Sequence, residues 1–262
     1  MILNLHFVQL SFTFCQRLRI ILKKPNLHKI VERKGFRMTN RFEIPSLLDV
    51  NKTMAAELFL SLHEPWEAIP AIREFILTLG ETLSDELFWH PEKDVWIAKT
   101  AQVFPSAYIK GPCIIDEEAE IRHCAFIRGS VIVGKHAVVG NSTELKNAIL
   151  FDRVQVPHFN YIGDSVLGYR SHIGAGGVTS NVKLDKTPIS VSCPDGRIDT
   201  GLIKFGAVLG DFVEVGCNSV LNPGTVIGRG TTVYPGSSVR GYVPENSIYK
   251  GCGEIVIKKH KE

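Results

Sequence analysis

The chain repeats an apolar side chain at every sixth position over two long stretches. The first runs from residue 97 to residue 151, and the second from residue 203 to residue 239. The repeating residues are Ile97, Val103, Ile109, Ile115, Ile121, Ile127, Val133, Val139, Leu145 and Phe151, then Ile203, Leu209, Val215, Leu221, Ile227, Val233 and Val239. A small or β-branched residue stands four positions after most of them. A period of six fits neither an amphipathic helix nor simple strand alternation, and it is typical of parallel β-helix repeats.

This period predicts a three-sided prism wound from short strands. Each hexad forms one side with its aliphatic residue pointing inward, and three hexads make a coil of about 18 residues. Neighbouring coils stack as parallel strands, so the core is a set of aliphatic ladders. Between Phe151 and Leu167 the spacing falls to 16 residues, which predicts a local change in the wall. The period alone does not determine the hand of the coil.

Ahead of the repeats, residues 41–96 follow a helical pattern. One helix is predicted over residues 46–62, and a second begins at Pro70, presents an apolar stripe and ends at Gly80. We expect this segment to cap the open end of the prism, because stacked repeats need a polar cover at their ends. The tryptophans expected to provide the cover are Trp66, Trp89 and Trp96.

The remaining segments flank these units. Residues 17–41 carry nine Lys or Arg against the single acid Glu32, and the apolar stretch before them is too short to span a bilayer. We interpret residues 1–40 as a mis-assigned extension upstream of Met38 or a disordered arm, with a targeting sequence or membrane arm as the alternative. The β-helix is expected over residues 97–250, with a loop inserted at 182–202 and a tail at 251–262.

Composition is that of a globular protein of enzyme size. Of the 262 residues, 44% are hydrophobic and 22% are charged, and a formal net charge of +3 is too slight to indicate a nucleic-acid partner. The six cysteines form no C-x-x-C pair, which favours free thiols and a cytoplasmic protein. Only two of the 23 glycines precede Gly111, so we expect neither a glycine-rich phosphate loop nor a nucleotide-binding α/β domain.

Three signatures stand close together in the repeats. They are Glu144-Leu-Lys146, His158-Phe-Asn-Tyr161-Ile-Gly-Asp164 and His172-Ile-Gly-Ala-Gly176. At this spacing, residues 128–181 resemble the acetyltransferase domain of the bifunctional bacterial N-acetylglucosamine-1-phosphate uridyltransferase/glucosamine-1-phosphate acetyltransferase, and the likeness resumes over residues 209–243. The resemblance implies an all-β, left-handed parallel β-helix that transfers an acetyl group from acetyl-coenzyme A (acetyl-CoA) to glucosamine 1-phosphate. The uridyltransferase domain of that family is not expected here.

The resemblance places a general base at His158. A neutral imidazole suits removal of a proton from an amine that attacks a thioester, while a solvent-facing histidine at a prism corner is the alternative. Glu144 matches a position near the substrate amine, and Asn181 matches one in the active-site groove. For Glu144, an ordinary ion pair with Lys146 is the alternative, because the two side chains face the same way on a strand.

Cations are predicted to stack along one edge. Lys110, Arg128 and Lys146 follow one another at intervals of 18 residues, so the repeat places them in successive coils about 4.8 Å apart. A bound phosphate would relieve their repulsion, whereas a basic edge screened by salt is the alternative. The resemblance implies that Arg128, Lys146 and Tyr161 bind the sugar phosphate.

The chain departs from the family pattern at three positions. His172 replaces an asparagine that contacts the sugar, and Cys217 and Pro235 replace a serine and an alanine along the acyl-CoA groove. Proline lacks an N–H, so that backbone donor is absent. The cofactor groove is expected to include the turn at Gly174, Ala175 and Gly176, whose backbone N–H groups would stabilise an oxyanion.

The inserted loop and the histidines complete the list of candidates. In the family such a loop closes the active site and one of its lysines contacts phosphate, for which Lys183 and Lys186 are both candidates. Zinc would require clustered ligands, but successive intervals of 13, 22 and 14 residues separate four histidines. These histidines are His123, His136, His158 and His172. No metal site is predicted.

Two functions remain open. The first is an N-acyltransferase acting on an amino-sugar phosphate with acetyl-CoA. The second is a non-catalytic module that binds sugar phosphate and trimerises, like the prisms attached to sugar nucleotidyltransferases. His158 favours the first, and His172 and Pro235 favour the second. In either case a cytoplasmic homotrimer is expected, with pockets between subunits and no nucleic-acid or membrane partner.

Overall fold

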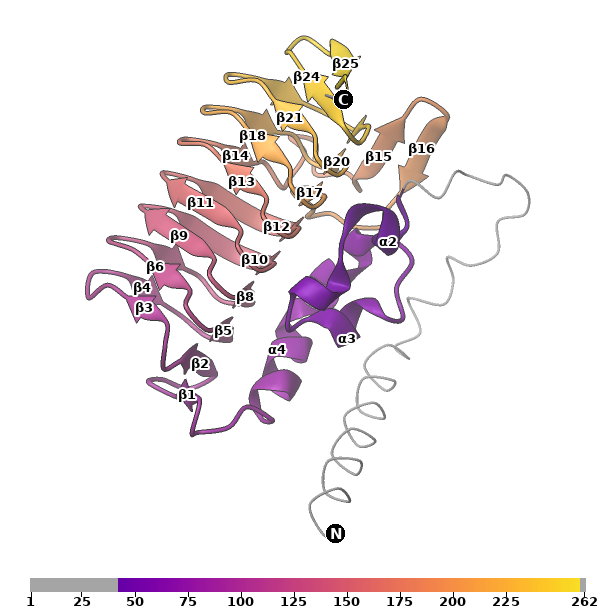
Figure 1. The fold of residues 1–262 in the computed structure, drawn as a ribbon. Helices are drawn as coiled ribbons and strands as arrows, with labels where there is room; N and C mark the ends of the chain where they lie inside the picture. Colours follow the sequence, from indigo (N-terminus) through magenta and orange to yellow (C-terminus); the bar gives the residue numbers. More distant parts are fainter. Residues whose placement is uncertain (1–41, 260–262) are drawn as a thin grey trace.

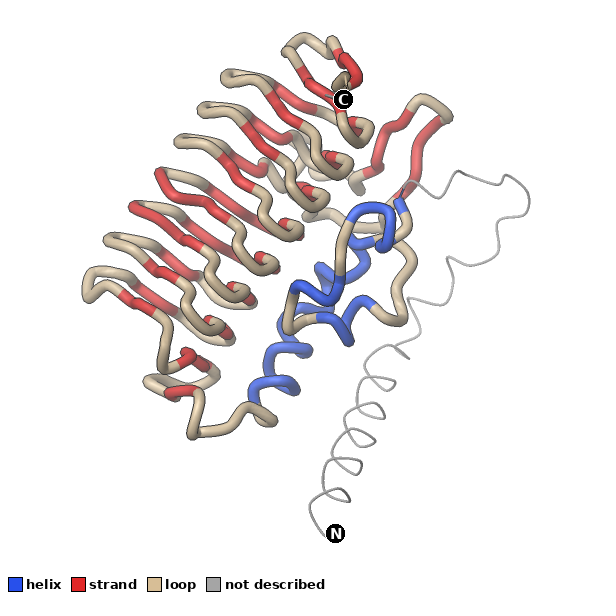
Figure 2. Tube along the Cα trace, in the orientation of Figure 1, coloured by secondary structure: helices blue, strands red, loops and turns tan. Residues whose placement is uncertain are grey.

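Residues 42–259 are described by the computed structural model, and most of them form a three-sided stack of coils (Figure 1). A helical segment lies along one side of the stack, and short strands recur at matching positions of successive coils (Figure 2). The fold is the left-handed parallel β-helix that was predicted. The expectation for residues 1–40 falls outside the described residues. Within residues 42–259, no helix is long and apolar enough to cross a bilayer.

The strands line three faces of the prism. The first face contains β3 (Gln102–Val103), β6 (Glu120–Ile121), β9 (Val138–Asn141), β11 (Gln155–His158), β13 (His172–Ile173), β18 (Glu214–Val215), β21 (Thr232–Val233) and β24 (Ser247–Tyr249), and β25 (Ile255–Ile257) pairs antiparallel with the last. The second contains β4 (Tyr108–Ile109), β7 (Phe126–Ile127), β14 (Val178–Thr179), β19 (Val220–Leu221) and β22 (Ser238–Val239). The third contains β1 (Phe88–Trp89), β2 (Val95–Ala98), β5 (Cys113–Ile115), β8 (Val131–Val133), β17 (Ala207–Leu209), β20 (Thr225–Ile227) and β23 (Tyr242–Val243). The long strands β10 (Glu144–Leu150) and β12 (Tyr161–Leu167) belong to both the second and third faces.

The inward ladder follows the six-residue period except in two places. Ile127 pairs with Leu145 across 18 residues, but Leu145 pairs with Ile162 across 17. The turn after Lys146 is one residue shorter, and Asn147 adopts a left-handed φ of 50°, which asparagine tolerates. Leu150 rather than Phe151 therefore continues the ladder, and Phe151 packs edge-on against Phe59 with ring centroids 5.6 Å apart. The second exception is Ile203, which is 56% exposed and lies outside the ladder.

The third face is apolar on its outer side as well. The middle residue of each three-residue strand there points outward and is nevertheless fully buried. These residues are Ile114, Ile132, Ile149, Val166, Val208 and Val226. Because water is excluded from them, this face must be covered by other parts of the chain. The helical segment supplies the cover: α4 contacts β5, β8 and β10, and a neighbouring turn contacts β12.

The helical segment differs from the prediction in shape and position. The helix predicted over 46–62 is three short pieces, α2 (Ile44–Leu47), η3 (Val50–Lys52) and α3 (Ala56–Phe59), because the residues between them are extended. The second helix ends at Gly80 as predicted, but Pro70 lies in the 3₁₀ segment η4 (Pro65–Ala71) and α4 begins at Ile72 (Ile72–Gly80).

The predicted end cap is wrong, because the helices lie along the third face of the prism (Figure 1). Trp66 packs on Phe205 with centroids 5.9 Å apart, and Trp89 is 57% exposed. Trp96 packs so close to Gly80 that a Cβ there would lie 2.4 Å from its ring. Glycine is therefore required at the end of α4.

A buried carboxyl group at the turn after β5 predicts a pH effect on stability. Burial raises the pKa of Asp116 to about 6 from 3.8, although the Glu117 N–H donates to its Oδ1. The folded protein therefore binds this proton more tightly than the unfolded chain does, so stability falls as pH rises from about 4 to about 6. Relative to Asp116→Asn, the unfolding free energy of the wild type should drop by about 2 kcal/mol between pH 4 and pH 7. Urea titrations of both proteins test this, and parallel pH profiles would contradict it.

Candidate functional site

A line of cations, the cation edge, occupies the turn between the second and third faces. It consists of Lys110 after β4, Arg128 after β7 and Lys146 within β10. The pairing of Ile109 with Ile127 and of Ile127 with Leu145 places the three residues in successive coils. The stacking therefore follows directly from the strand register.

Two of these cations are paired with carboxylates of the chain. Arg128 Nη1 lies 2.7 Å from Glu144 Oε1, and Lys146 Nζ lies 2.8 Å and 2.9 Å from the two oxygens of Asp164. The ion pair expected between Glu144 and Lys146 is therefore replaced by one with Arg128. The repulsion between stacked cations is relieved without a ligand, although each cation keeps further donors and Arg128 is largely exposed.

Asp164 is the centre of this site, and the sequence analysis did not assign it a role. Its side chain is 3% exposed and accepts hydrogen bonds from Lys146 Nζ, from Asn147 Nδ2 at 2.8 Å, and from Asn181 Nδ2. A buried carboxylate needs such donors to offset its lost hydration. Its place at the end of the His158–Asp164 signature, 18 residues after Lys146, was a signal that could have revealed it.

Tyr161 points outward from the second face, between Glu144 below it and Val178 above it in the strand register. Burial is the main cause that raises its pKa, and the charges of Asp164 and Glu144 raise it further. The phenol therefore stays protonated at neutral pH and can donate a hydrogen bond. Arg128, Glu144, Lys146, Tyr161 and Asn181 thus form one connected group around Asp164.

The predicted base and cofactor residues lie on the opposite edge of the same face. This histidine edge is the turn between the first and second faces. The N–H of Gly176 donates to His158 O at 3.0 Å, that of Asn218 to Ala175 O at 2.8 Å, and that of Gly236 to Cys217 O at 2.8 Å. The edge therefore runs through His158, Ala175, Cys217 and Pro235. Since Gly236 supplies the hydrogen bond at the last level, Pro235 leaves the ladder intact.

Asn160 joins the strand of His158 to the glycine turn. Its Oδ1 accepts the N–H of His158 at 3.1 Å, and its Nδ2 donates to Gly174 O at 2.8 Å. Asn160 is 3% exposed, whereas the side chain of His158 is exposed. The backbone around the imidazole is therefore held in place while the ring remains accessible.

Three predicted residues lie away from the two edges within one chain. His172 points from the first face and its Nδ1 lies 2.8 Å from Glu214 Oε2. Lys183 donates to the Pro188 carbonyl at 2.7 Å, and Lys186 is exposed with a φ of 56°. Both lysines belong to the insertion at 182–202, which contains an antiparallel hairpin of β15 (Ser190–Cys193) and β16 (Gly196–Asp199) rather than only a loop.

The chemistry available at these edges does not include a metal centre in the part of the chain that the structure describes. No three His, Cys, Asp or Glu side chains come together there as metal ligands. The five cysteines among those residues are free thiols, and Cys217 on the histidine edge is exposed. The arrangement offers an imidazole on one side of the second face and a group of cations, amides and a phenol on the other.

Comparison with known proteins agrees with this architecture. A family profile for the GMPPB C-terminal domain matches residues 109–229, which lie within the coils. The bifunctional sugar-1-phosphate nucleotidylyltransferase/acetyltransferase of Sulfurisphaera tokodaii is 30% identical over 180 residues, covering 62% of this chain and 45% of that protein. The bifunctional protein GlmU of Methanococcus vannielii is 27% identical over 225 residues, covering 82% of this chain and 53% of that protein.

A solved structure is also similar. It is a hexapeptide transferase family protein from Anaplasma phagocytophilum, matched over 64% of this chain and 80% of its own with 14% identity and a TM-score of 0.36. The chain spans about half the length of the two curated relatives. The family profile and the GlmU relative confirm the resemblance drawn from the sequence signatures. The coiled part of the chain is a left-handed β-helix domain of the GlmU type.

Proposed function

We propose that the protein is an N-acyltransferase that acetylates an amino-sugar phosphate, such as glucosamine 1-phosphate, with acetyl-CoA. One observation carries the proposal: the second face is bordered by His158 on one edge and by Arg128 and Lys146 on the other. A sugar phosphate lying across this face would present its amine to the imidazole and its phosphate to the cations. The similarity to proteins described as GlmU and as a nucleotidylyltransferase/acetyltransferase supports the same activity.

In the proposed reaction the amine attacks the thioester carbonyl while His158 takes its proton. The new N–C bond forms, the C–S bond breaks, and the thiolate of coenzyme A leaves with the proton from the imidazolium. Of the glycine turn, Gly174 N–H donates to Val215 O at 2.7 Å and Gly176 N–H to His158 O at 3.0 Å. Ala175 N–H is thus the donor of this turn that we assign to the oxyanion.

The acyl donor is proposed to run along the histidine edge. Ala175, Cys217 and Pro235 occupy successive levels above His158, so an extended pantetheine arm there would bring its thioester to the imidazole. The sulfur of Cys217 lies beside Gly174, where a Cβ would come within 2.9 Å of it. The groove is therefore narrow at this level and suits a thin, unbranched chain.

A homotrimer is proposed to complete the site. A single convex wall does not enclose a substrate, and His172 lies on a different face from the cation edge. Large apolar side chains remain exposed on and beside the second face, which favours its contact with another protomer. These side chains are Tyr108, Phe126, Phe159 and Val220. Light scattering should give three times the chain mass of 29.1 kDa, and a monomer would contradict the proposal.

The experiment that tests the proposed function measures thiol release. The full chain is incubated with glucosamine 1-phosphate and acetyl-CoA, and free coenzyme A thiol and N-acetylated product are quantified. Product formation that depends on both substrates is expected. Binding of the sugar phosphate without thiol release would instead support the non-catalytic module, which His172 and Pro235 favour.

A further inference from the structure

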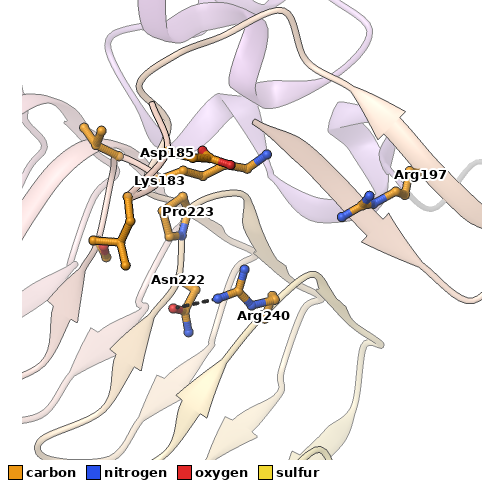
Figure 3. A pocket seen from close by; sticks show the side chains of 9 residues that line it. Lys183, Asp185, Arg197, Asn222, Pro223 and Arg240 are labelled. Atoms are coloured by element: carbon orange, nitrogen blue, oxygen red, sulfur yellow. Dashed lines mark hydrogen bonds between the residues drawn. The ribbon is translucent and has the colours of Figure 1, made fainter. Parts of the chain in front are cut away.

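A pocket of about 580 Å³ lies above the candidate site, between the insertion and the upper coils (Figure 3). Lys183 and Asp185 reach it from the segment after β14, Arg197 from β16, and Asn222 and Arg240 from the turns after β19 and β22. The two guanidinium groups come from separate walls, one from the hairpin and one from the prism (Figure 3). This volume is in the range of small-molecule sites.

The cations of this pocket are bound to uncharged acceptors. Arg240 donates to the amide oxygen of Asn222 at 3.4 Å, and Arg197 donates to the hydroxyl of Ser192 at 3.5 Å. Lys183 donates to a main-chain carbonyl. Arg128 and Lys146, by contrast, each hold a carboxylate. The strongest uncompensated positive charge beside the site therefore lies in this pocket, where an anion would gain charge-assisted hydrogen bonds.

The charge of the pocket identifies the class of anion. Hydrogen bonds from Thr187 lower the pKa of Asp185, so this carboxylate is ionised at neutral pH. Three cations and one carboxylate leave a net charge of +2, from +3 and −1. A diphosphate ester carries a matching charge and can engage two arginines on opposite walls, each through a planar fork. A single phosphate would fill only a small part of the volume.

The pocket also continues the cation edge. Val178 pairs with Val220, and Val220 pairs with Ser238, so Ser180, Asn222 and Arg240 occupy successive levels of the same edge. Ser180 lines the pocket, and the next residue, Asn181, donates to Asp164 at the candidate site. A ligand held in the pocket could therefore extend a sugar onto the second face.

We propose that this pocket binds the diphosphate group of a nucleoside-diphosphate-linked sugar, with Arg197, Arg240 and Lys183 as its ligands. The acceptor substrate would then be a sugar joined to a diphosphate rather than to one phosphate. The position of the sugar amine rests on the proposed function, whereas the diphosphate pocket does not. Binding measured without an acyl donor therefore separates failure of the pocket from failure of acyl transfer.

Isothermal titration of the full chain with inorganic pyrophosphate, uridine diphosphate and orthophosphate tests the pocket. Both diphosphates should bind, and orthophosphate should bind at least about tenfold more weakly. Arg197→Gln and Arg240→Gln should each weaken diphosphate binding about tenfold or more, the loss of a charge-assisted hydrogen bond. Arg73→Gln is the matched control, because Arg73 is exposed on α4 and removes the same charge away from the pocket.

The pyrophosphate and nucleotide arms distinguish the two sources of the diphosphate. Tighter binding of uridine diphosphate than of pyrophosphate supports a nucleotide ligand, and equal or weaker binding overturns that part of the proposal. Absence of diphosphate binding, or binding that Arg128→Gln abolishes while Arg240→Gln leaves it intact, overturns the pocket itself. Thermal melts verify folding, and Arg240→Lys, which keeps the charge without the fork, should give intermediate affinity.

Discussion

Replacing His158 by alanine should lower the rate of acetyl transfer by about 10²- to 10⁴-fold, the usual contribution of a general base. The imidazole is exposed, and the hydrogen bond that anchors the residue to Asn160 comes from its main-chain N–H. The substitution should therefore leave the fold and the thermal midpoint nearly unchanged. The measurement is thiol release from acetyl-CoA with glucosamine 1-phosphate at saturating concentrations.

A matched control separates this effect from the loss of any histidine. His63 lies in the N-terminal helical segment, away from both edges, and His63→Ala should retain the wild-type rate. A rate for His158→Ala within a few-fold of wild type would remove His158 from the proposed chemistry. The histidine edge would then be a structural corner, which was the alternative left open for this residue.

Asp164→Ala should lower the free energy of unfolding by about 3–5 kcal/mol, the cost of leaving one partner of a buried ion pair. The carboxylate is 3% exposed and holds Lys146, Asn147 and Asn181. Its removal leaves an ammonium group and two amides without their acceptor. Urea denaturation followed by circular dichroism measures the loss.

Two comparisons make this result specific. Asp164→Asn keeps a side-chain oxygen and a residue type that tolerates the φ of 47°, so it should cost less than the alanine substitution. Asp185→Ala removes an exposed carboxylate, and we expect a change within about 0.5 kcal/mol. Equal losses for Asp164→Ala and Asp185→Ala would show that the buried network does not stabilise the fold.

The core of the prism was predictable because the period itself specifies it. From Ile115 to Leu145 every sixth residue is fully buried, as a repeating wall requires. The shift at Asn147 was harder to place, because Leu150 and Phe151 are both apolar and both buried. Only the strand register shows that Leu150 faces inward and that Phe151 faces the helices.

The covered third face carried a sequence signal that the period concealed. Every third hexad contains three consecutive apolar or small residues, as in Cys113–Ile115 and Val131–Val133, so its outward residue is apolar too. That pattern predicts a covering layer along one face rather than a cap at one end. Propensity could not show this, because the position of the helices depends on tertiary contacts.

The candidate site was predictable where it depends on the repeat. An interval of one coil stacks Arg128 below Lys146, and the same logic places Ala175 and Cys217 above His158. The ion pairs were not predictable, since Arg128 and Lys146 could each have reached more than one carboxylate. The hairpin over the upper pocket was also missed, because four-residue strands in an insertion give little periodicity.

A crystal structure with glucosamine 1-phosphate and coenzyme A tests the central claim most directly. The account predicts the sugar across the second face, its amine within about 3 Å of the His158 imidazole and its phosphate in contact with Arg128 or Lys146. Coenzyme A should follow Ala175, Cys217 and Pro235. A sugar phosphate bound on another face, or an amine out of reach of His158, would contradict the account.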